Sequence, residues 1–144
     1  MDILSIIFTS LFITFVIPYE KIDDSFRPFY NEYKVLYQQS CSMKARLPKR
    51  LVVSLSTGTV DSTEEAYCMR LGVSARINVD KDIWNHYDNQ GKREIAYHEL
   101  SHCILKLDHV DNSEHYMYAY HDGGMSYSTL VSQLIQDFRD VCNG

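Results

Sequence analysis

The sequence predicts a compact α+β domain with a small mixed sheet, a helix that carries a pair of histidines, and a C-terminal helix. Residues 51–56 read Leu-Val-Val-Ser-Leu-Ser, which is typical of a strand because branched aliphatic side chains fit a pleated surface. Apolar side chains recur at helical spacing in residues 93–106 and again in residues 126–141. With 144 residues, the chain has the length of one domain. We therefore expect a single unit at residues 19–144 behind an apolar leader at residues 1–18.

The elements before the histidine helix follow from the same patterns. A helix is predicted at residues 25–39, capped by Ser25 or Asp24, with Pro28 in the first turn, where a missing N–H costs nothing. Residues 57–73 predict a loop with some hairpin character. Residues 75–80 alternate small or apolar with polar side chains, which predicts a strand with one exposed face. This strand is either an edge along which an extended peptide can pair or an ordinary exposed strand.

Residues 81–90 carry Trp84, which we expect in the core, and His86, which we expect at the surface or in a structural role. Residues 109–124 are polar and predict an irregular segment. The last helix is predicted to begin at Ser126 or Ser128 and to end near Val141.

The leader at residues 1–18 is an almost unbroken apolar run. Its length suits the hydrophobic region of a signal peptide and is slightly short for a spanning helix. It carries Asp2 but neither Lys nor Arg, and no small-x-small cleavage site precedes Tyr19. We expect export or membrane anchoring through residues 1–18, and hence an extracytoplasmic location; the alternative is a buried N-terminal strand or helix.

Charge and cysteine content narrow the partners and the compartment. The formal net charge is -5 and no basic block occurs, so no nucleic-acid partner is expected, and the domain is predicted to be a monomer. The four cysteines form no C-x-x-C pair, which argues against a zinc knuckle. In an exported chain they would form two disulfides with three pairings open, whereas in a cytosolic chain they would be buried thiols. The cysteines are Cys41, Cys68, Cys103 and Cys142.

The histidine helix carries the most informative motif, His98-Glu99-Leu100-Ser101-His102. Four residues along an α-helix turn the side chain by about 400° and raise it by about 6 Å, so His98 and His102 share one face and can bind the same ion. Glu99 lies about 100° around the helix from His98, a position suited to a metal-bound water rather than to the metal itself. The motif predicts one Zn²⁺ ion with Glu99 as the catalytic base.

A catalytic zinc usually takes a third protein ligand. Five of the six histidines, at positions 98, 102, 109, 115 and 121, lie in one short stretch together with several acidic residues. A later glutamate as third ligand is disfavoured because none follows Glu114. The candidates are His109, which would complete a three-histidine site, and Asp108. If His109 is the ligand, Asp108 could contact a ligand side chain and orient it without binding the metal itself. His115 and His121 are expected to be polar loop residues.

Residues 98–109 resemble the metzincin zinc peptidases, whose extended motif is H-E-x-x-H-x-x-G-x-x-H or ends in Asp. Aligned without a gap, Leu105 stands where that family has a glycine and Asp108 stands at the third ligand; one extra residue makes His109 the ligand. Some small bacterial zinc peptidases are more similar, with a cysteine after the second histidine, as Cys103 has here, and a later histidine. The resemblance covers residues 66–120 and implies a zincin-like fold.

The resemblance also implies a methionine turn beneath the metal. Met117 is the candidate for this turn, although plain core packing explains it equally well. Tyr116, Tyr118 and Tyr120 are candidates for a phenol that donates to an oxyanion or contacts the substrate.

The predicted function is zinc-dependent hydrolysis of a peptide bond by metal-activated water, with Glu99 as the general base and a peptide or protein as the substrate. Two alternatives remain open. One is a zinc hydrolase of another amide, such as cell-wall peptide, and the other is an inactive zinc-binding or structural module.

Overall fold

The computed structural model describes residues 19–41, 47–58, 65–120 and 123–144. The predicted leader at residues 1–18 lies outside them. The elements, in chain order, are β1 (Tyr19–Ile22), α1 (Arg27–Cys41), β2 (Arg50–Ser56), β3 (Ala66–Leu71), β4 (Ser74–Asp80), α2 (Lys81–His86), α3 (Asn89–Leu100), a π-helical turn (Ser101–Leu105) and α4 (Tyr127–Asn143). This is the predicted α+β composition with a C-terminal helix.

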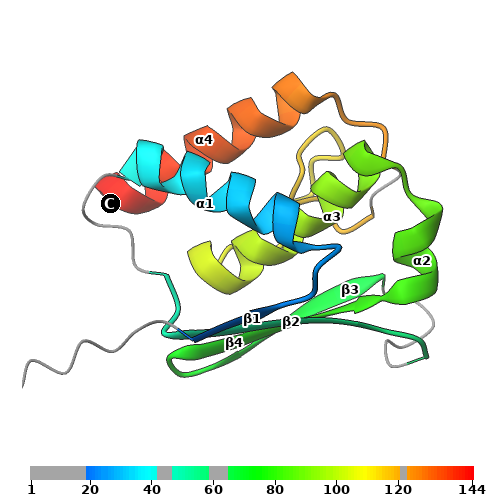
Figure 1. Ribbon diagram of the computed structural model, residues 1–144. Coiled ribbons are helices and arrows are strands. Elements are labelled where there is room, and N and C mark those ends of the chain that lie inside the picture. The colour runs from blue at the N-terminus through cyan, green and yellow to red at the C-terminus, as the bar shows by residue number, and fades with distance from the viewer. Residues whose placement is uncertain (1–18, 42–46, 59–64, 121–122) are drawn as a thin grey trace, which may run out of the picture.

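The sheet is mixed and covered on one face. Its four described strands lie in the order β1-β2-β4-β3, with β1, β2 and β4 parallel and β3 antiparallel to β4. Helices α1, α3 and α4 lie over one face of this sheet, while no described helix covers the other face (Figure 1). The helix with the histidine pair therefore lies directly above the sheet, with β3 as the nearest edge.

Two strands, β1 and β3, were not predicted, and of the two interpretations left open for residues 75–80 the edge strand is wrong. β1 had no prediction, and β3 falls in the segment expected to be a loop with some hairpin character. Gly72, at a φ of 60°, makes the turn that folds β3 back along β4. As a result, the strand predicted at residues 75–80 is interior, and β3 forms the edge instead. Alternation of exposed and buried side chains is the same for an edge and an interior strand, so the pattern could not separate them.

Aromatic rings pack with aliphatic side chains in the core between the helices and the sheet. Tyr33 of α1 packs edge-on against Tyr97 of α3 and Phe138 of α4, with ring centroids 5.6 and 5.1 Å apart. Trp84 is 1% exposed and contacts Phe26, as expected for a core residue. The abundant tyrosines therefore bring apolar area to the core and hydroxyl groups to its polar contacts.

Two disulfides join distant parts of the chain. Cys41–Cys142 ties the end of α1 to the end of α4, and Cys68–Cys103 ties β3 to the π-helical turn. This settles the pairing that the sequence left open. Disulfides persist in oxidising compartments, so they suggest an extracytoplasmic environment. Within the described residues, no helix has both the length and the apolar composition to cross a membrane.

Candidate metal centre

Helix α3 begins with a side-chain cap at Asp88 and with a tight contact between Gly91 and the Tyr87 ring. The Asp88 carboxylate accepts a hydrogen bond from the Gly91 N–H at 2.8 Å, which satisfies one of the free donors of the first turn. A Cβ atom on Gly91 would collide with the Tyr87 ring, so glycine permits this contact. The helix therefore starts at Asn89, four residues before the predicted start at residue 93.

The end of the helix explains how a chain without the expected glycine still turns. Residues Ser101–Leu105 form a π-helical turn, and Lys106 adopts the left-handed conformation with a φ of 62°, its N–H bonded to the Ser101 carbonyl. The helix therefore ends within one residue of the end of the helical pattern at residue 106. A π-helical turn holds one more residue than an α-helical turn. This turn therefore places one more residue before His109 than a regular α-helical turn would.

Three imidazole rings converge at the end of this helix. His98 Nε2 lies 2.9 Å from His102 Nε2 and 3.1 Å from His109 Nε2. The ligand atoms of these three histidines all lie within 4.8 Å of one another, and Asp108 does not belong to the group. The structure therefore contains a three-histidine group that could hold one metal ion.

Two of the rings are oriented by main-chain carbonyl groups. His98 Nδ1 lies 2.8 Å from the Tyr116 carbonyl oxygen, and His102 Nδ1 lies 2.6 Å from the Leu107 carbonyl oxygen. A carbonyl oxygen only accepts, so each Nδ1 carries the proton and each Nε2 presents a lone pair. Carbonyl groups thus do the orienting that the sequence assigned to Asp108, whose side chain is exposed.

This donor set fits a cation. Two unprotonated nitrogen atoms 2.9 Å apart repel each other unless a positive charge lies between them. Nitrogen ligands of a tetrahedral zinc stand about 3.3 Å apart, which follows from Zn–N bonds of about 2.0–2.1 Å and is close to the observed spacing. Burial also lowers the pKa of the His102 imidazole, which favours the neutral form that metals bind.

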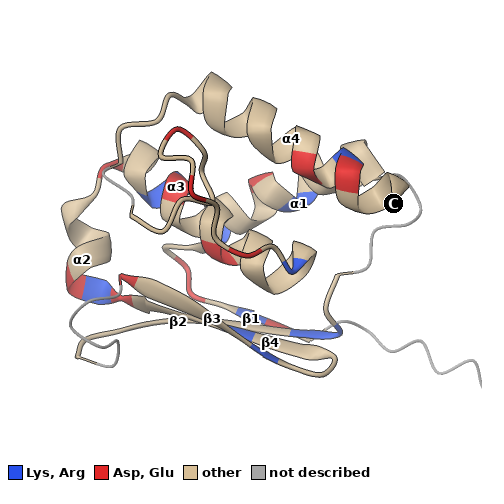
Figure 2. Ribbon diagram, turned by 180° about the vertical axis from the view of Figure 1, so that it is seen from behind, with Lys and Arg blue, Asp and Glu red and all other residues tan. Residues whose placement is uncertain are grey.

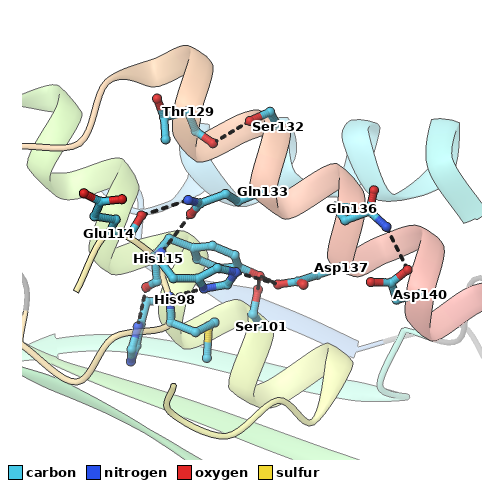
Figure 3. A network of polar contacts seen from close by, with 12 residues as sticks. His98, Ser101, Glu114, His115, Thr129, Ser132, Gln133, Gln136, Asp137 and Asp140 are labelled. Carbon is cyan, nitrogen blue, oxygen red and sulfur yellow. Dashed lines mark hydrogen bonds and ion pairs between the residues drawn. The ribbon is translucent and has the colours of Figure 1, made fainter. Parts of the chain in front are cut away.

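The loop whose carbonyl orients His98 is held from α4 by Gln133 (Figure 3). The Gln133 side-chain amide accepts from the Tyr116 N–H at 3.0 Å and donates to the Glu114 carbonyl at 2.8 Å. One side chain therefore fixes two main-chain groups of the same loop, much as a neighbouring strand would. The position of the His98 ring consequently depends on a contact with the C-terminal helix.

The Tyr116 hydroxyl does not face the metal centre. It lies 3.0 Å from Ser101 Oγ and 2.8 Å from Asp137 Oδ2, in the interior between α3 and α4. The expectation that this phenol could serve an oxyanion is therefore corrected. A buried hydroxyl needs hydrogen-bond partners, and the interior supplies them. Tyr116 acts at the site through its carbonyl instead.

Met117 and His115 belong to the same supporting loop. Met117 is 1% exposed and its carbonyl accepts from the Val110 N–H at 3.0 Å. His115 Nδ1 accepts from the Met117 N–H at 3.1 Å, so this histidine stabilises the loop, as expected. His121 lies outside the described residues.

A cavity of about 430 Å³ opens beside the three histidines. Glu99, 5% exposed, lines it together with the ligand group, and β3 forms the opposite wall. Of the three candidate tyrosines, only Tyr120 lines this cavity, and its side chain is 80% exposed. The β3 residues of the wall are Ala66, Tyr67, Cys68 and Arg70.

The wall formed by β3 is covalently tied to the metal centre. Cys103 directly follows His102 in sequence, and its disulfide partner Cys68 lines the cavity. The bond therefore fixes the edge strand relative to a candidate ligand. Sequence reasoning missed this tie because it missed β3, although the largely apolar run of residues 66–71 followed by Gly72 is a recognisable hairpin signal.

Fold and site together define a small α+β domain with a mixed four-stranded sheet and a three-histidine group that could hold a metal ion. Comparisons with protein-family models, with curated proteins and with solved structures found no match for this chain. The resemblance to metzincins therefore rests on the motif residues themselves.

Proposed function

We propose that this chain is a zinc-dependent hydrolase that cleaves peptide bonds, with His98, His102 and His109 as the zinc ligands. The observation that carries the proposal is the convergence of three Nε2 atoms at the wall of a cavity that also holds Glu99. Three histidine ligands leave one tetrahedral position open, which distinguishes catalytic from structural zinc sites. A bound zinc ion would supply a Lewis acid that polarises the scissile carbonyl and acidifies a water molecule.

Glu99 would serve as the general base. It is adjacent to His98 in sequence and lines the same cavity as the ligand group. Its carboxylate would take a proton from the attacking water and later pass that proton to the leaving amine. The low exposure of Glu99 supports this role, because little competing water surrounds a carboxylate that is 5% exposed.

The edge strand β3 would position the substrate. Its outer edge is unpaired among the described strands, and residues from it line the cavity. An extended peptide could pair its main chain with such an edge, which would hold the scissile bond near the ligand group. Tyr120, the only candidate tyrosine in the cavity wall, would then be the phenol that contacts the substrate.

Two variants test the assignment of the base and the metal. Glu99→Gln removes the base but leaves the ligands, so zinc content should stay near one equivalent while cleavage of a peptide library falls by at least about 10²- to 10⁴-fold. Retained cleavage would refute the role of Glu99. His109→Ala should lose zinc, as measured by elemental analysis, while Asp108→Ala should keep it; the reverse result would move the third ligand to Asp108.

A substrate panel tests the reaction class. Cleavage of unmodified peptides by the zinc-loaded chain, abolished in Glu99→Gln, supports peptide hydrolysis. Cleavage restricted to cell-wall peptides would favour the other amide hydrolase, and zinc binding without any hydrolysis would favour an inactive zinc-binding module.

A further inference from the structure

The open face of the sheet, opposite the helices, carries an unusual set of side chains at the end where β1, β2 and β4 begin. Strand pairing aligns its side chains in two rows across the four strands. The first row is Tyr19, Arg50, Ser74 and Leu71, and the second is Lys21, Val52, Arg76 and Met69. These positions alternate with the buried ones, Leu51, Ala75 and Ile77, so they share the face that no described helix covers.

This patch, defined by the two rows, mixes cations with exposed apolar side chains. Leu71 is 66% exposed and Met69 is 42% exposed. Val73, beside the Gly72 turn, is 60% exposed and lies next to Lys49, whose N–H bonds to the Val73 carbonyl at 3.0 Å. A cluster of exposed aliphatic side chains bordered by charged residues is typical of an interaction surface.

The patch is positively charged, whereas the chain as a whole is negatively charged. The chain has a formal net charge of -5, yet the two rows hold Lys21, Arg50 and Arg76 and no carboxylate. A shallow hollow of about 290 Å³ on this face is lined by two of these arginines and by apolar or small residues. Figure 2 shows Lys and Arg on this part of the sheet, while Asp and Glu are spread over the loops around α3, the helices and the sheet.

We propose that this patch docks the domain on an anionic lipid surface. Cations attract anionic headgroups, the aliphatic side chains at the hairpin tip enter the headgroup region, and Tyr19 suits the same interface. A second copy of the chain is a poor occupant because its three cations would face three like charges. Chain connectivity favours a membrane over an acidic protein, because the apolar run of residues 1–18 joins the domain at Tyr19, within the first row.

Docking in this orientation keeps the metal centre accessible. Along β3, Ala66, Tyr67, Cys68 and Arg70 line the metal cavity, whereas Met69 and Leu71 line the hollow on the open face. From residue 68 to residue 71 the two sets alternate, so at the hairpin end of β3 the two surfaces lie on opposite faces, and a lipid surface on the open face leaves the cavity exposed. This proposal does not depend on the proposed hydrolysis.

Site-specific tryptophans in the full chain test the docking. The native chain has a single tryptophan, Trp84, which is 1% exposed and gives a constant background. In Leu71→Trp, fluorescence should shift to shorter wavelength and be quenched by brominated acyl chains in vesicles of phosphatidylcholine and phosphatidylglycerol. The matched control is Val35→Trp, on α1 at a site that is 50% exposed. Its fluorescence should neither shift nor be quenched.

Charge reversal tests the electrostatic part. In the Leu71→Trp chain, we replace Arg50 and Arg76 together by glutamate. This should raise the lipid concentration needed for half-maximal quenching at least about 30-fold, because each cation near an anionic surface strengthens binding more than about fivefold. Lys81→Glu with Arg139→Glu changes the net charge equally, at exposed sites outside the patch, and should leave quenching intact.

The outcomes separate docking from simple tethering. If the Leu71→Trp chain co-sediments with vesicles but its introduced indole is not quenched, residues 1–18 alone hold the chain and the proposal is refuted. Equal quenching on pure phosphatidylcholine, or quenching that survives reversal of both arginines, also overturns it. Far-UV circular dichroism and the buried emission of Trp84, measured on every variant, confirm that the domain is folded.

Discussion

His98 and His102 lie one helical turn apart, yet different parts of the molecule hold their rings. The His102 ring bonds to the carbonyl of Leu107, five residues later in the same helix end. The His98 ring bonds to the carbonyl of Tyr116, 18 residues later, on a loop that Gln133 of α4 holds in place. One candidate ligand is therefore positioned by local geometry and the other by tertiary structure.

The motif and the helix end that follows it therefore account for the orientation of the His102 ring but not for that of the His98 ring. The geometry around His102 follows from how the helix ends, which is a property of residues 101–107. The geometry around His98 requires the packing of α4 against the loop, and α4 is tied in turn to α1 by the disulfide of Cys142. A substitution far from the motif should therefore displace the His98 ring more than the His102 ring.

The largest expected effect comes from breaking the support of His98. Gln133→Ala removes both of its hydrogen bonds to the loop. The Tyr116 carbonyl is then held less firmly, by the Val110–Met117 contact and the Tyr116 hydroxyl. Loss of such an outer contact typically lowers metal affinity by about 10- to 100-fold. We expect a decrease of that size in zinc affinity, measured by competition with a chelator.

Two further variants make this test specific. Gln136 lies one turn later on α4, and its side chain donates to Asp140 of the same helix, so Gln136→Ala should leave zinc affinity unchanged. Gln133→Glu keeps the acceptor for the Tyr116 N–H but sets an oxygen against the Glu114 carbonyl, and should weaken zinc binding as well. Equal affinities for all three variants and the parent chain would show that α4 does not position His98.

The two disulfides allow a second comparison, with an intermediate effect. The bonds close loops with sequence separations of 35 and 101 residues, so replacing either pair by serine should lower the free energy of unfolding by about 4–5 kcal/mol at most. Only the Cys68–Cys103 pair joins a cavity wall to the residue after His102. Its loss should therefore lower kcat/KM several-fold beyond any change seen for the Cys41–Cys142 pair, with zinc still bound.

Matched unfolding curves are the control for this experiment. Activity is compared at a temperature at which both double variants are fully folded, as judged by urea unfolding. If both variants lose the same fraction of kcat/KM, the Cys68–Cys103 bond acts on stability alone and does not hold β3 against the metal centre.

The sequence predicted the local part of this architecture well. The strand at residues 51–56, the helix with the histidine pair and the cap at Ser126 all follow from propensity and periodicity within a few residues, and the structure confirms them. His109 could be proposed because it lies close to the motif, although the choice against Asp108 depended on a π-helical turn. No periodicity encodes a single π turn, since it is one residue inserted into an otherwise regular helix.

The parts that could not be predicted are contacts between distant residues. Cys68–Cys103 was one of three equally allowed pairings, and its choice follows only from β3 lying beside the helix. Gln133 looked like an ordinary polar position on an amphipathic helix. Tyr116 was proposed for its phenol and acts through its carbonyl, because main-chain hydrogen bonds leave no mark on residue identity.

The smallest expected effect concerns the local support of His102. Lys106 ends the helix in the left-handed conformation, which costs a residue with a side chain about 1 kcal/mol relative to glycine. Lys106→Gly should therefore raise the free energy of unfolding by about 0.5 kcal/mol, since the more flexible unfolded chain offsets part of the gain. Zinc affinity should not change, because the Leu107 carbonyl keeps its place. A drop in zinc affinity measured beside the urea unfolding curve would show that the lysine side chain, and not the backbone turn, holds His102.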